Sequence, residues 1–321
     1  MVEFGHQRYA WLSEVLELPN GIPSHDTFNR VLQLIDPKHL SDCLDKDGAA
    51  LLGSISGKQL AIDGKKLKGV SPRSKGNSGL YILNAWVCEN RLCIGQEKVE
   101  DKSNEITAIP ALLEQLNIEG AVVSIDAIGC QTLIADQIIE QGGEYLLAVK
   151  KNQKELFEQI EDSFLLTPSV TQDMQWEYQR GRFEQRKCQI LPAKQMLLPE
   201  NLNQWKGLKT LIKIEAQRQK KDKISQETRY YISSEDGQAA RYFNHITRGH
   251  WGVENHLHWH LDITFKEDAS RARSGYAPQN LSILRKIALH RIAQMKDKLS
   301  LKKRRYRASL NNDYLLTLIQ V

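Results

Sequence analysis

The sequence predicts an α/β fold in which one mixed sheet is flanked by helices. Three strand-like segments first follow one another without an intervening helix, at residues 58–67, 78–90 and 91–100. Helices and strands then alternate from residue 103 to residue 165. The resulting order, β-β-β-α-β-α-β-α, is typical of a ribonuclease-H-like fold, in which three antiparallel strands precede α/β crossovers.

The chain before these strands is predicted to be helical. Ser24 or Asp26 is placed to cap a helix over residues 23–36. Apolar residues recur in this helix at helical spacing, at Phe28, Val31, Leu32 and Ile35. Gly53 and Gly57 begin and end a short segment that is expected to be a linker to the first strand.

Turn and cap signals separate the elements of the α/β region. Glu89 and Asn90 are expected to form a tight turn between the second and third strands, and Ser103 or Asn104 to cap the next helix. Two buried strands are predicted at residues 120–129 and 144–151, with helices at residues 103–117, 130–143 and 152–165.

The pattern then changes to short alternating segments between polar turns, which predicts a β-rich insertion. A final amphipathic helix is expected at residues 278–296. The predicted regions are a helical N-terminal segment (1–57), the first part of the core (58–166), the insertion (167–234), the second part of the core (235–295) and a basic C-terminal tail (296–321).

Composition excludes several classes of protein. Of the 321 residues, 41% are apolar, which is enough for a buried core, but no apolar run is long enough to cross a membrane. The first residues lack the basic and apolar regions of a signal peptide. The five cysteines are scattered and form no C-x-x-C pair. They favour reduced thiols in a cytoplasm over a disulfide scaffold or a zinc ribbon.

The basic residues are concentrated in separate segments, although the net charge is only +5. These segments read "GKKLKG", "KKNQK", "QRGRFEQRK", "RQKKDK" and "LKKRRYR". Any single cluster is more typical of a solvated surface, but several recurring clusters are equally consistent with one long polyanion bound along them.

Two aspartates occupy matching positions at the predicted ends of two strands. Asp63 follows the apolar residues of "LAIDGK", and Asp126 follows those of "VVSIDAIG". An acid at the carboxyl end of a buried strand points into the crevice where open α/β sheets bind ligands, although a single such acid is often a turn or cap residue. The first and fourth strands are neighbours in a ribonuclease-H-like sheet, so the two carboxylates are predicted to face one site.

Two carboxylates held close together repel each other unless a cation lies between them, which makes them natural magnesium ligands. A third acid is expected from a helix that flanks the sheet. Positions four apart share one face of a helix, so His250, Glu254, His258 and Asp262 are predicted to line one side, with Glu254 as its central carboxylate.

Other side chains suggest alternative sites. His256 and His260 have the spacing of a zinc-binding helix, but Leu257 stands where a zincin carries its glutamate. A packing face or a DNA contact explains these histidines better than zinc does. Cys130 at a helix start could be a nucleophile, but no histidine is close to it in sequence.

Seven segments together resemble the H-repeat-associated transposases of bacterial insertion sequences, a DDE group. They read "AIDGKKLKG", "VEDKSNEITAIPALL", "SIDAIGCQTLIADQI", "YLLAVKKNQ", "GRFEQR", "RGHWGVENHLHWHLDITFKEDASRAR" and "APQNLSILRKIALH". The similarity extends from about Gly21 to Met295, in order and with family spacing. It implies a ribonuclease-H-like catalytic core that a β-rich insertion interrupts before the last acid.

The resemblance also implies a site and a reaction. Asp63 and Asp126 correspond to the two catalytic aspartates and Glu254 to the glutamate, and together they would hold two Mg²⁺ or Mn²⁺ ions at a scissile phosphate. The implied reaction is DNA cleavage at element ends followed by strand transfer into a target. The implied partner is DNA, bound by a homodimer at the nucleoid, with no membrane and no small-molecule substrate.

Several polar and aromatic side chains are candidates for contacts with that DNA. Trp176 and Tyr178 could stack on exposed bases. The candidates for phosphate contacts are Lys150, Lys151, Asn152, Arg180, Arg182, Arg186, His250, Asn255 and His258.

The sequence departs from the family in two respects. Many relatives carry Tyr, Arg and Lys at −7, −4 and +7 from the glutamate, where this chain has Thr247, His250 and Leu261. The DNA-clamping part of that signature is therefore not transferred. Relatives also carry more helical sequence at the start, as expected if this chain is a truncated or decayed copy. Two alternatives are an inactive or domesticated DNA-binding relic and a host nuclease of the same fold.

Overall fold

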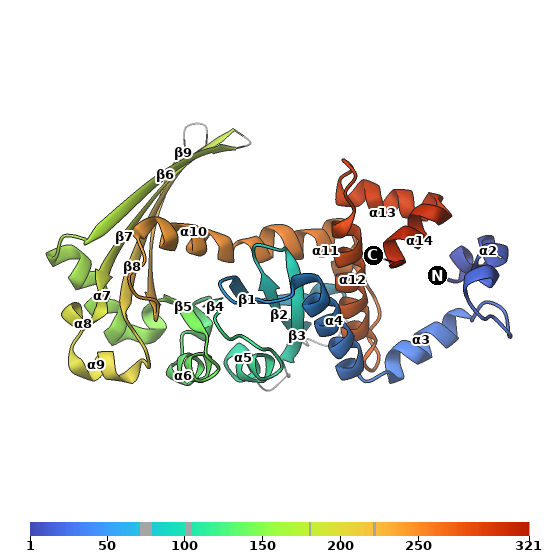
Figure 1. The fold of residues 1–321 in the computed structure, drawn as a ribbon, viewed down its shortest axis with the longest axis horizontal. Coiled ribbons are helices and arrows are strands. Elements are labelled where there is room, and N and C mark those ends of the chain that lie inside the picture. Colours follow the sequence, from blue (N-terminus) through green and yellow to red (C-terminus); the bar gives the residue numbers. More distant parts are fainter. Residues whose placement is uncertain (71–78, 100–103, 180, 221–222, 321) are drawn as a thin grey trace. The chain divides into compact units, whose positions relative to one another are not determined.

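The structure is a computed structural model, and it describes residues 1–70, 79–99, 104–179, 181–220 and 223–320. The described residues contain a nine-stranded sheet in the order β3-β2-β1-β4-β5-β9-β8-β7-β6 (Figure 1). The strands are β1 (Gln59–Leu67), β2 (Leu80–Val87), β3 (Leu92–Val99), β4 (Val122–Ile125), β5 (Glu144–Val149), β6 (Thr171–Gln179), β7 (Arg182–Pro192), β8 (Thr210–Lys220) and β9 (Lys223–Ser233).

The first five strands confirm the predicted ribonuclease-H-like core. Strands β1, β4 and β5 are parallel, with Ile62 opposite Ile125 and Ile125 opposite Leu147. Strands β2 and β3 are joined by a short turn at residues 88–91, in which Arg91 has a φ of 56°. Helices then provide the crossovers that parallel strands require.

The crossover helices pack against the sheet. Asn104 caps the first of them by accepting a hydrogen bond from the backbone N–H of Ile106. The helices of this part of the chain are α5 (Glu105–Glu114), α6 (Thr132–Glu140), α7 (Lys154–Leu166), α8 (Ala193–Met196), α9 (Pro199–Gln204) and α10 (Ala240–His250). Helices α5 and α6 contact strands β3 and β5, respectively.

The strands of the predicted insertion extend the core sheet instead of forming a separate one. Strand β9 pairs antiparallel with β5, with Ile232 opposite Leu147, and β8, β7 and β6 follow in antiparallel order. Pairing with β9 covers the edge of β5 that would otherwise be open. A buried cluster that includes Val122, Ile212 and Phe243 packs α10 against this sheet.

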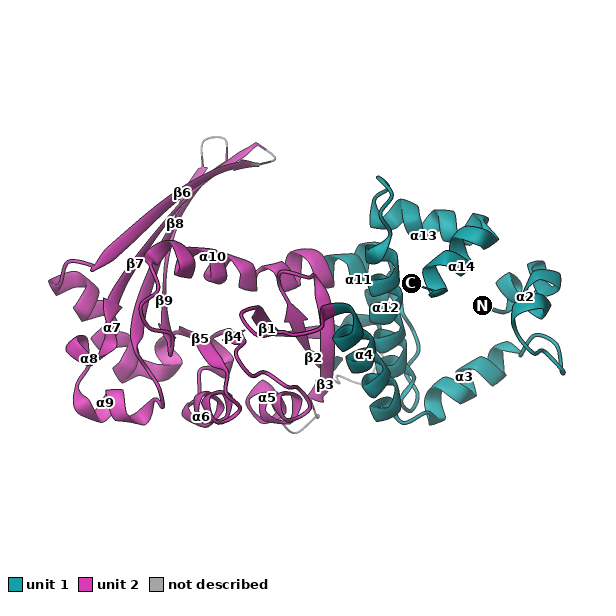
Figure 2. Ribbon diagram, viewed as in Figure 1, with its two compact units in different colours: residues 1–51, 66–81, 258–321 teal, residues 52–65, 82–257 magenta. Residues whose placement is uncertain are grey.

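Two compact units divide the chain, namely residues 1–51, 66–81 and 258–321, and residues 52–65 and 82–257 (Figure 2). The first unit is helical. Its helices are α1 (Val2–Gln7), α2 (Tyr9–Val15), α3 (His25–Leu34), most of α4 (Pro37–Leu52), α11 (Trp259–Ile263), α12 (Ala277–Gln294), α13 (Leu301–Leu310) and α14 (Asn312–Gln320).

Local signals explain the helices of this unit. Ser24 is the N-cap of α3, as predicted, and accepts a hydrogen bond from the backbone N–H of Thr27. The side chain of Asn280 in α12 donates to the carbonyl oxygens of Leu32 and Ile35, at 2.9 and 2.8 Å, where α3 ends. The basic residues near the C-terminus form α13, which packs with α14 and the end of α12 around a small apolar cluster. None of the helices in the described ranges is both long and apolar enough to cross a bilayer.

Candidate active site

Asp63 and Asp126 follow the paired residues of two neighbouring parallel strands. The pairing of β1 with β4 begins at Gln59 and ends where Ile62 lies opposite Ile125. The next residues along the two strands are Asp63 and Asp126. Strand β1 continues to Leu67, beyond the residues that pair with β4. Asp63 therefore lies within the strand, whereas the sequence had suggested a position at its end. Both aspartates nonetheless lie at the same edge of the parallel part of the sheet.

Asp126 also caps a short turn. Its carboxylate accepts a hydrogen bond of 3.1 Å from the backbone N–H of Ile128, in the 3-10 turn η2 (Ala127–Gly129). The cap occupies one carboxylate oxygen, and no hydrogen bond of the described residues occupies the other. The structural and the ligand-binding interpretations of this residue are therefore compatible.

Glu254 lies just beyond α10, in a π-helical segment, η4 (Val253–His258). Helix α10 ends at His250, with Trp251 as its C-cap. A π turn contains an additional residue, so the regular α-helical spacing predicted from His250 to Asp262 is wrong. Such segments are frequent at functional sites, because they present a side chain in a direction that an α-helix does not allow.

The three acids lie close enough for their charges to repel one another. Burial, followed by the negative charges of Glu254, Asp126 and Glu105, raises the pKa of Asp63 to about 7. Burial also raises the pKa of Glu254; the positive charge of Arg229 opposes this shift, and Asp126 adds to it. The side chains predicted from the sequence thus share one electrostatic environment.

Glu105 is a fourth acid in this environment, and sequence reasoning did not identify it. It lies in the first turn of α5, which packs against η2. Burial and the charge of Asp126 raise the pKa of Glu105. A glutamate in the first turn is favourable in any helix, because it complements the helix dipole. Its sequence position alone therefore carried no signal of a role at the site.

The chemistry of these donors suits a hard divalent cation. Carboxylate oxygens from separate elements are the ligands that Mg²⁺ and Mn²⁺ prefer. Within the described residues, however, no group of three or more His, Cys, Asp or Glu side chains is arranged to hold a metal ion. His256 and His260 therefore belong to no such group either. The fit of Asp63, Asp126 and Glu254 to a cation therefore rests on donor type and on the repulsion that a cation would relieve.

The raised pKa of Asp63 predicts a specific dependence of stability on pH. The folded state binds the proton more tightly than the unfolded chain, whose carboxyl keeps its ordinary pKa of 3.8. The contribution of Asp63 to stability is therefore full below about pH 4 and is lost as the pH rises through about 7. We expect the free energy of unfolding of the metal-free protein to decline more steeply over this range in the wild type than in Asp63→Asn. Urea unfolding in EDTA at several pH values measures this difference, and equal slopes would contradict it.

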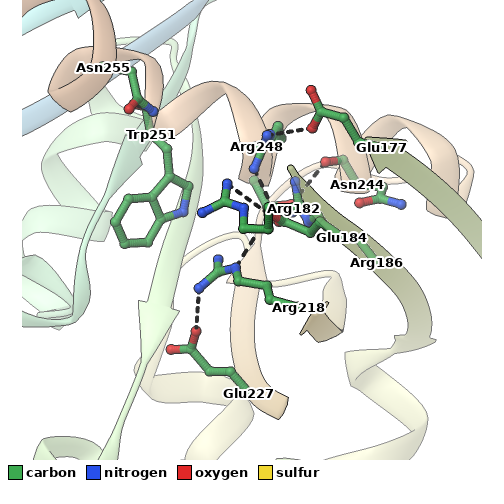
Figure 3. A network of polar contacts seen from close by, with 11 residues as sticks. Glu177, Arg182, Glu184, Arg186, Arg218, Glu227, Asn244, Arg248, Trp251 and Asn255 are labelled. Atoms are coloured by element: carbon green, nitrogen blue, oxygen red, sulfur yellow. Dashed lines mark hydrogen bonds and ion pairs between the residues drawn. The ribbon is translucent and has the colours of Figure 1, made fainter. Parts of the chain in front are cut away.

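A cluster of ion pairs centred on Glu184 lies in the extended part of the sheet (Figure 3). The side chain of Glu184 is only 3% exposed, and its carboxylate pairs with Arg182 at 3.3 Å, Arg218 at 3.4 Å and Arg248 at 3.2 Å. Arg248 also pairs with Glu177, at 2.6 Å. A buried carboxylate among several cations is stable only while those cations remain. Glu184 therefore holds β7, β8 and α10 together.

A cavity of about 230 Å³ adjoins this cluster and extends to Glu254. Trp251 and Asn255 also line it (Figure 3). The guanidinium of Arg229 lies over the Trp251 ring, 4.4 Å from its centroid. Five arginines and three glutamates contribute to the wall, so the cavity carries a net positive charge; these residues are Arg182, Arg186, Arg218, Arg229, Arg248, Glu184, Glu227 and Glu254.

Arg186 is a buried cation in this wall. It is 8% exposed and donates a hydrogen bond of 3.1 Å to the hydroxyl of Thr247. Among the ion pairs of the described residues, none joins Arg186 to a carboxylate within 4.0 Å. Burial and the neighbouring charge of Arg248 lower the pKa of Arg186. A buried guanidinium whose described partner is a neutral hydroxyl favours an anion in the cavity.

The structure brings one group of predicted DNA contacts to the edge of the sheet that carries the aspartates. Lys150, Lys151 and Asn152 follow β5, which is parallel to β4. The side-chain amide of Asn152 donates to the carbonyl oxygen of Ala127, at 2.8 Å, immediately after Asp126. Both lysines are exposed.

The other predicted contacts are more scattered. Arg182 and Arg186 line the cavity, Arg180 lies outside the described residues, and His258 belongs to the other compact unit. Trp176 and Tyr178 are 61% and 74% exposed, on one face of β6.

Asn255 and His250 both have intramolecular partners. The side-chain amide of Asn255 donates to the carbonyl oxygen of Trp251, at 2.9 Å. The Nδ1 atom of His250 lies 3.1 Å from the hydroxyl oxygen of Ser124. His250 is therefore tied to the sheet in a way that its sequence position did not indicate.

Comparison with known proteins gives a consistent family. The chain is 38% identical over 324 residues to "Putative transposase YncI" of Escherichia coli O157:H7, an alignment that covers 98% of this chain and 82% of that protein. It is 35% identical over 328 residues to "H repeat-associated putative transposase YhhI" of Escherichia coli (strain K12), covering 99% and 86%. A cryo-EM structure of a piggyBac transposase synaptic complex with hairpin DNA matches with a TM-score of 0.45 and 13% identity, over 83% of this chain and 55% of that one.

Family models match almost all of the chain. The model described as DDE_Tnp_1-associated matches residues 1–46. The model described as Transposase DDE domain matches residues 56–291, which include all three acids. With most of its length matched in this way, the chain belongs to the transposase DDE domain family.

Proposed function

We propose that this protein is an insertion-sequence transposase that cleaves DNA at element ends and joins those ends to a target, using Asp63, Asp126 and Glu254. The observation that carries the proposal is that Asp63 in β1 is buried near Asp126, which follows β4, and Glu254 in η4; burial and then these negative charges raise the pKa of Asp63. Carboxylates that lie close together repel one another, and a bound cation would relieve that repulsion. An element has two ends to cleave, so we also infer a homodimer on DNA.

The three carboxylates would hold the divalent ions. When bound there, Mg²⁺ or Mn²⁺ would supply Lewis-acid chemistry at a scissile phosphate. The two aspartates would contribute from neighbouring strands, and Glu254 would add a third carboxylate from the segment that follows α10. Burial of Cys130 raises the pKa of its thiol, which argues against a thiolate nucleophile there.

Basic groups near the acids would position the DNA. Arg229, stacked on Trp251, and the buried Arg186 give the cavity beside Glu254 the charge to receive a phosphate. Lys150 and Lys151 extend this positive charge along the edge of the sheet. Phosphate contacts of this kind set the register of the DNA without reading its sequence.

A matched pair of lysines tests this assignment. Lys150→Ala is expected to weaken DNA binding about 5- to 10-fold at ~0.1 M salt and to lower the slope of log K against log [salt] by about 1, because one phosphate contact is lost. Lys154→Ala is the control, since Lys154 is exposed on α7 and pairs with Glu158. Fluorescence anisotropy with labelled DNA measures both variants. Equal effects of the two substitutions would remove Lys150 from the interface.

One cleavage-and-joining assay separates the proposed function from its alternatives. The protein is incubated with Mg²⁺, a target plasmid and DNA that carries the terminal repeats of its element. A transposase gives 3′-hydroxyl ends that become joined to the plasmid. A host nuclease gives cleavage without joined products, and a DNA-binding relic gives a stable complex without cleavage; either outcome would overturn the proposal.

A further inference from the structure

A chain of hydrogen bonds links β1, β4 and α10, which carry or directly precede the three acids. The side-chain amide of Gln59 in β1 donates to the hydroxyl of Ser124 in β4 and to the carbonyl oxygen of Ile246 in α10, both at 2.8 Å. The Ser124 hydroxyl in turn lies 3.1 Å from Nδ1 of His250. Gln59 and Ser124 are 3% and 1% exposed, so water cannot replace these bonds.

The contact between Ser124 and His250 involves an uncharged ring. Burial lowers the pKa of His250 to about 4, although the charge of Asp126 and a hydrogen bond to the Ser124 backbone oppose this shift. The ring is therefore neutral, and its Nδ1 atom accepts from the Ser124 hydroxyl or donates to it according to the tautomer.

Each member of this chain lies a short, regular distance before one acid. Gln59 precedes Asp63 by four residues on β1, and Ser124 precedes Asp126 by two, so alternation along a strand places each pair on one face. His250 precedes Glu254 by four residues, across the junction between α10 and the π-helical segment η4.

The helix approaches the sheet closely at this point. A Cβ atom on Gly249 would lie 2.2 Å from the side-chain oxygen of Gln59, so a larger residue here would displace the amide group of Gln59, which donates two hydrogen bonds. The sulfur of Cys88 also contacts the carbonyl oxygen of Gly249, at 3.4 Å. The end of α10 is thus fixed on β1 and β4 immediately before Glu254.

We propose that Gln59, Ser124 and His250 are positioning residues that hold Glu254 in register with Asp63 and Asp126. This inference rests on the proposed function, because it assigns the hydrogen bonds to the carboxylates of that site. The bonds oppose the separation that repulsion between the acids favours. His250 then acts through Ser124 and not through direct contact with DNA.

Two substitutions of His250 distinguish these roles. Asn places its Oδ1 as many bonds from Cα as Nδ1 of histidine, so His250→Asn keeps an acceptor for Ser124. Gln places its amide where Nε2 lies, so His250→Gln keeps a group that faces away from Ser124. His250→Leu keeps neither group, and Ser124→Ala removes the hydroxyl with little change in packing. Ser163→Ala is the matched control, because the buried Ser163 donates to Gln159 within α7.

The primary measurement is Mn²⁺ binding to the full chain, followed by the electron paramagnetic resonance signal of free Mn²⁺. We expect Ser124→Ala and His250→Leu to weaken Mn²⁺ binding about 10- to 100-fold, as the loss of groups that orient metal ligands does. His250→Asn should recover the wild-type affinity within about threefold, whereas His250→Gln should not. The DNA affinity of His250→Asn and Ser124→Ala should match that of the Ser163→Ala control, and circular dichroism should show that all three variants are folded.

The outcomes separate this inference from the proposed function. Unchanged Mn²⁺ affinity in Ser124→Ala and His250→Leu, while Asp63→Asn abolishes binding, would overturn the positioning role alone. Loss of DNA affinity in His250→Leu that His250→Gln restores would assign the ring to DNA instead. Mn²⁺ binding that requires all three acids, without joined products in the assay above, would overturn the function and leave the positioning role intact. If His250→Leu does not fold, Ser124→Ala and the Asn and Gln variants decide the question.

Discussion

Asp63→Asn, Asp126→Asn and Glu254→Gln are each expected to reduce Mg²⁺-dependent cleavage of element ends by at least about 100-fold. Loss of a group that merely orients a metal ligand costs about 10- to 100-fold, so loss of a ligand itself should cost more. DNA binding should remain largely intact, because phosphate contacts and not these acids supply most of the affinity. Single-turnover cleavage of end-labelled DNA and an equilibrium binding assay measure the two effects separately.

Glu158→Gln provides the control for the change in charge. Glu158 lies on α7, is 57% exposed and pairs weakly with Lys154 at 3.9 Å, so its loss should leave cleavage unchanged. Undiminished cleavage by any one of the three variants would remove that residue from the catalytic set. Glu105→Gln belongs in the same series, since Glu105 shares the electrostatic environment of Asp63 and Asp126.

The position of the two aspartates at one edge of the sheet could be predicted from the sequence, because its signal is local. Each follows a run of buried apolar residues, and the order of strands and helices makes β1 and β4 parallel neighbours. Once that order is known, the ends of the paired segments must lie at one edge of the sheet. The same reasoning places Lys150 and Asn152 near Asp126, because they follow the next parallel strand.

Features that depend on contacts between distant segments could not be predicted in this way. The hydrogen bonds among Gln59, Ser124 and His250 join residues 65 and 126 positions apart, and nothing in the residues around each of them indicates the others. The π-helical segment that contains Glu254 begins just after α10 meets the sheet, and no pattern in its own residues distinguishes it from an α-helix. The ion pairs of Glu184 likewise require β7, β8 and α10 to be in place, whereas each arginine alone is typical of an exposed strand or helix.

Glu184→Gln is expected to destabilise the protein by about 3 kcal/mol or more, because it removes the buried negative charge that three arginines share. Arg182, Arg218 and Arg248 would then repel one another beside the buried Arg186. For a unit of this size the loss corresponds to a fall of about 6 to 12 °C in the thermal midpoint. Sulfate should restore part of the lost stability, since an anion can occupy the more positive cavity.

Glu215→Gln is the matched control for that experiment. Glu215 also lies in the extended part of the sheet and pairs with Lys213 at 2.9 Å and Lys187 at 4.0 Å, but it is 40% exposed, so its loss should cost less than about 1 kcal/mol. Differential scanning fluorimetry with and without sulfate compares the two variants. Two outcomes would contradict the view that one buried carboxylate balances the charge of this cavity. One is equal destabilisation by the two substitutions, and the other is a Glu184→Gln protein that sulfate stabilises no more than it stabilises the wild type. A difference of the expected size would mean that Glu184 holds in place the arginines that make the cavity beside Glu254 positively charged. The affinity of the cavity for phosphate and the stability of the fold would then depend on the same residue.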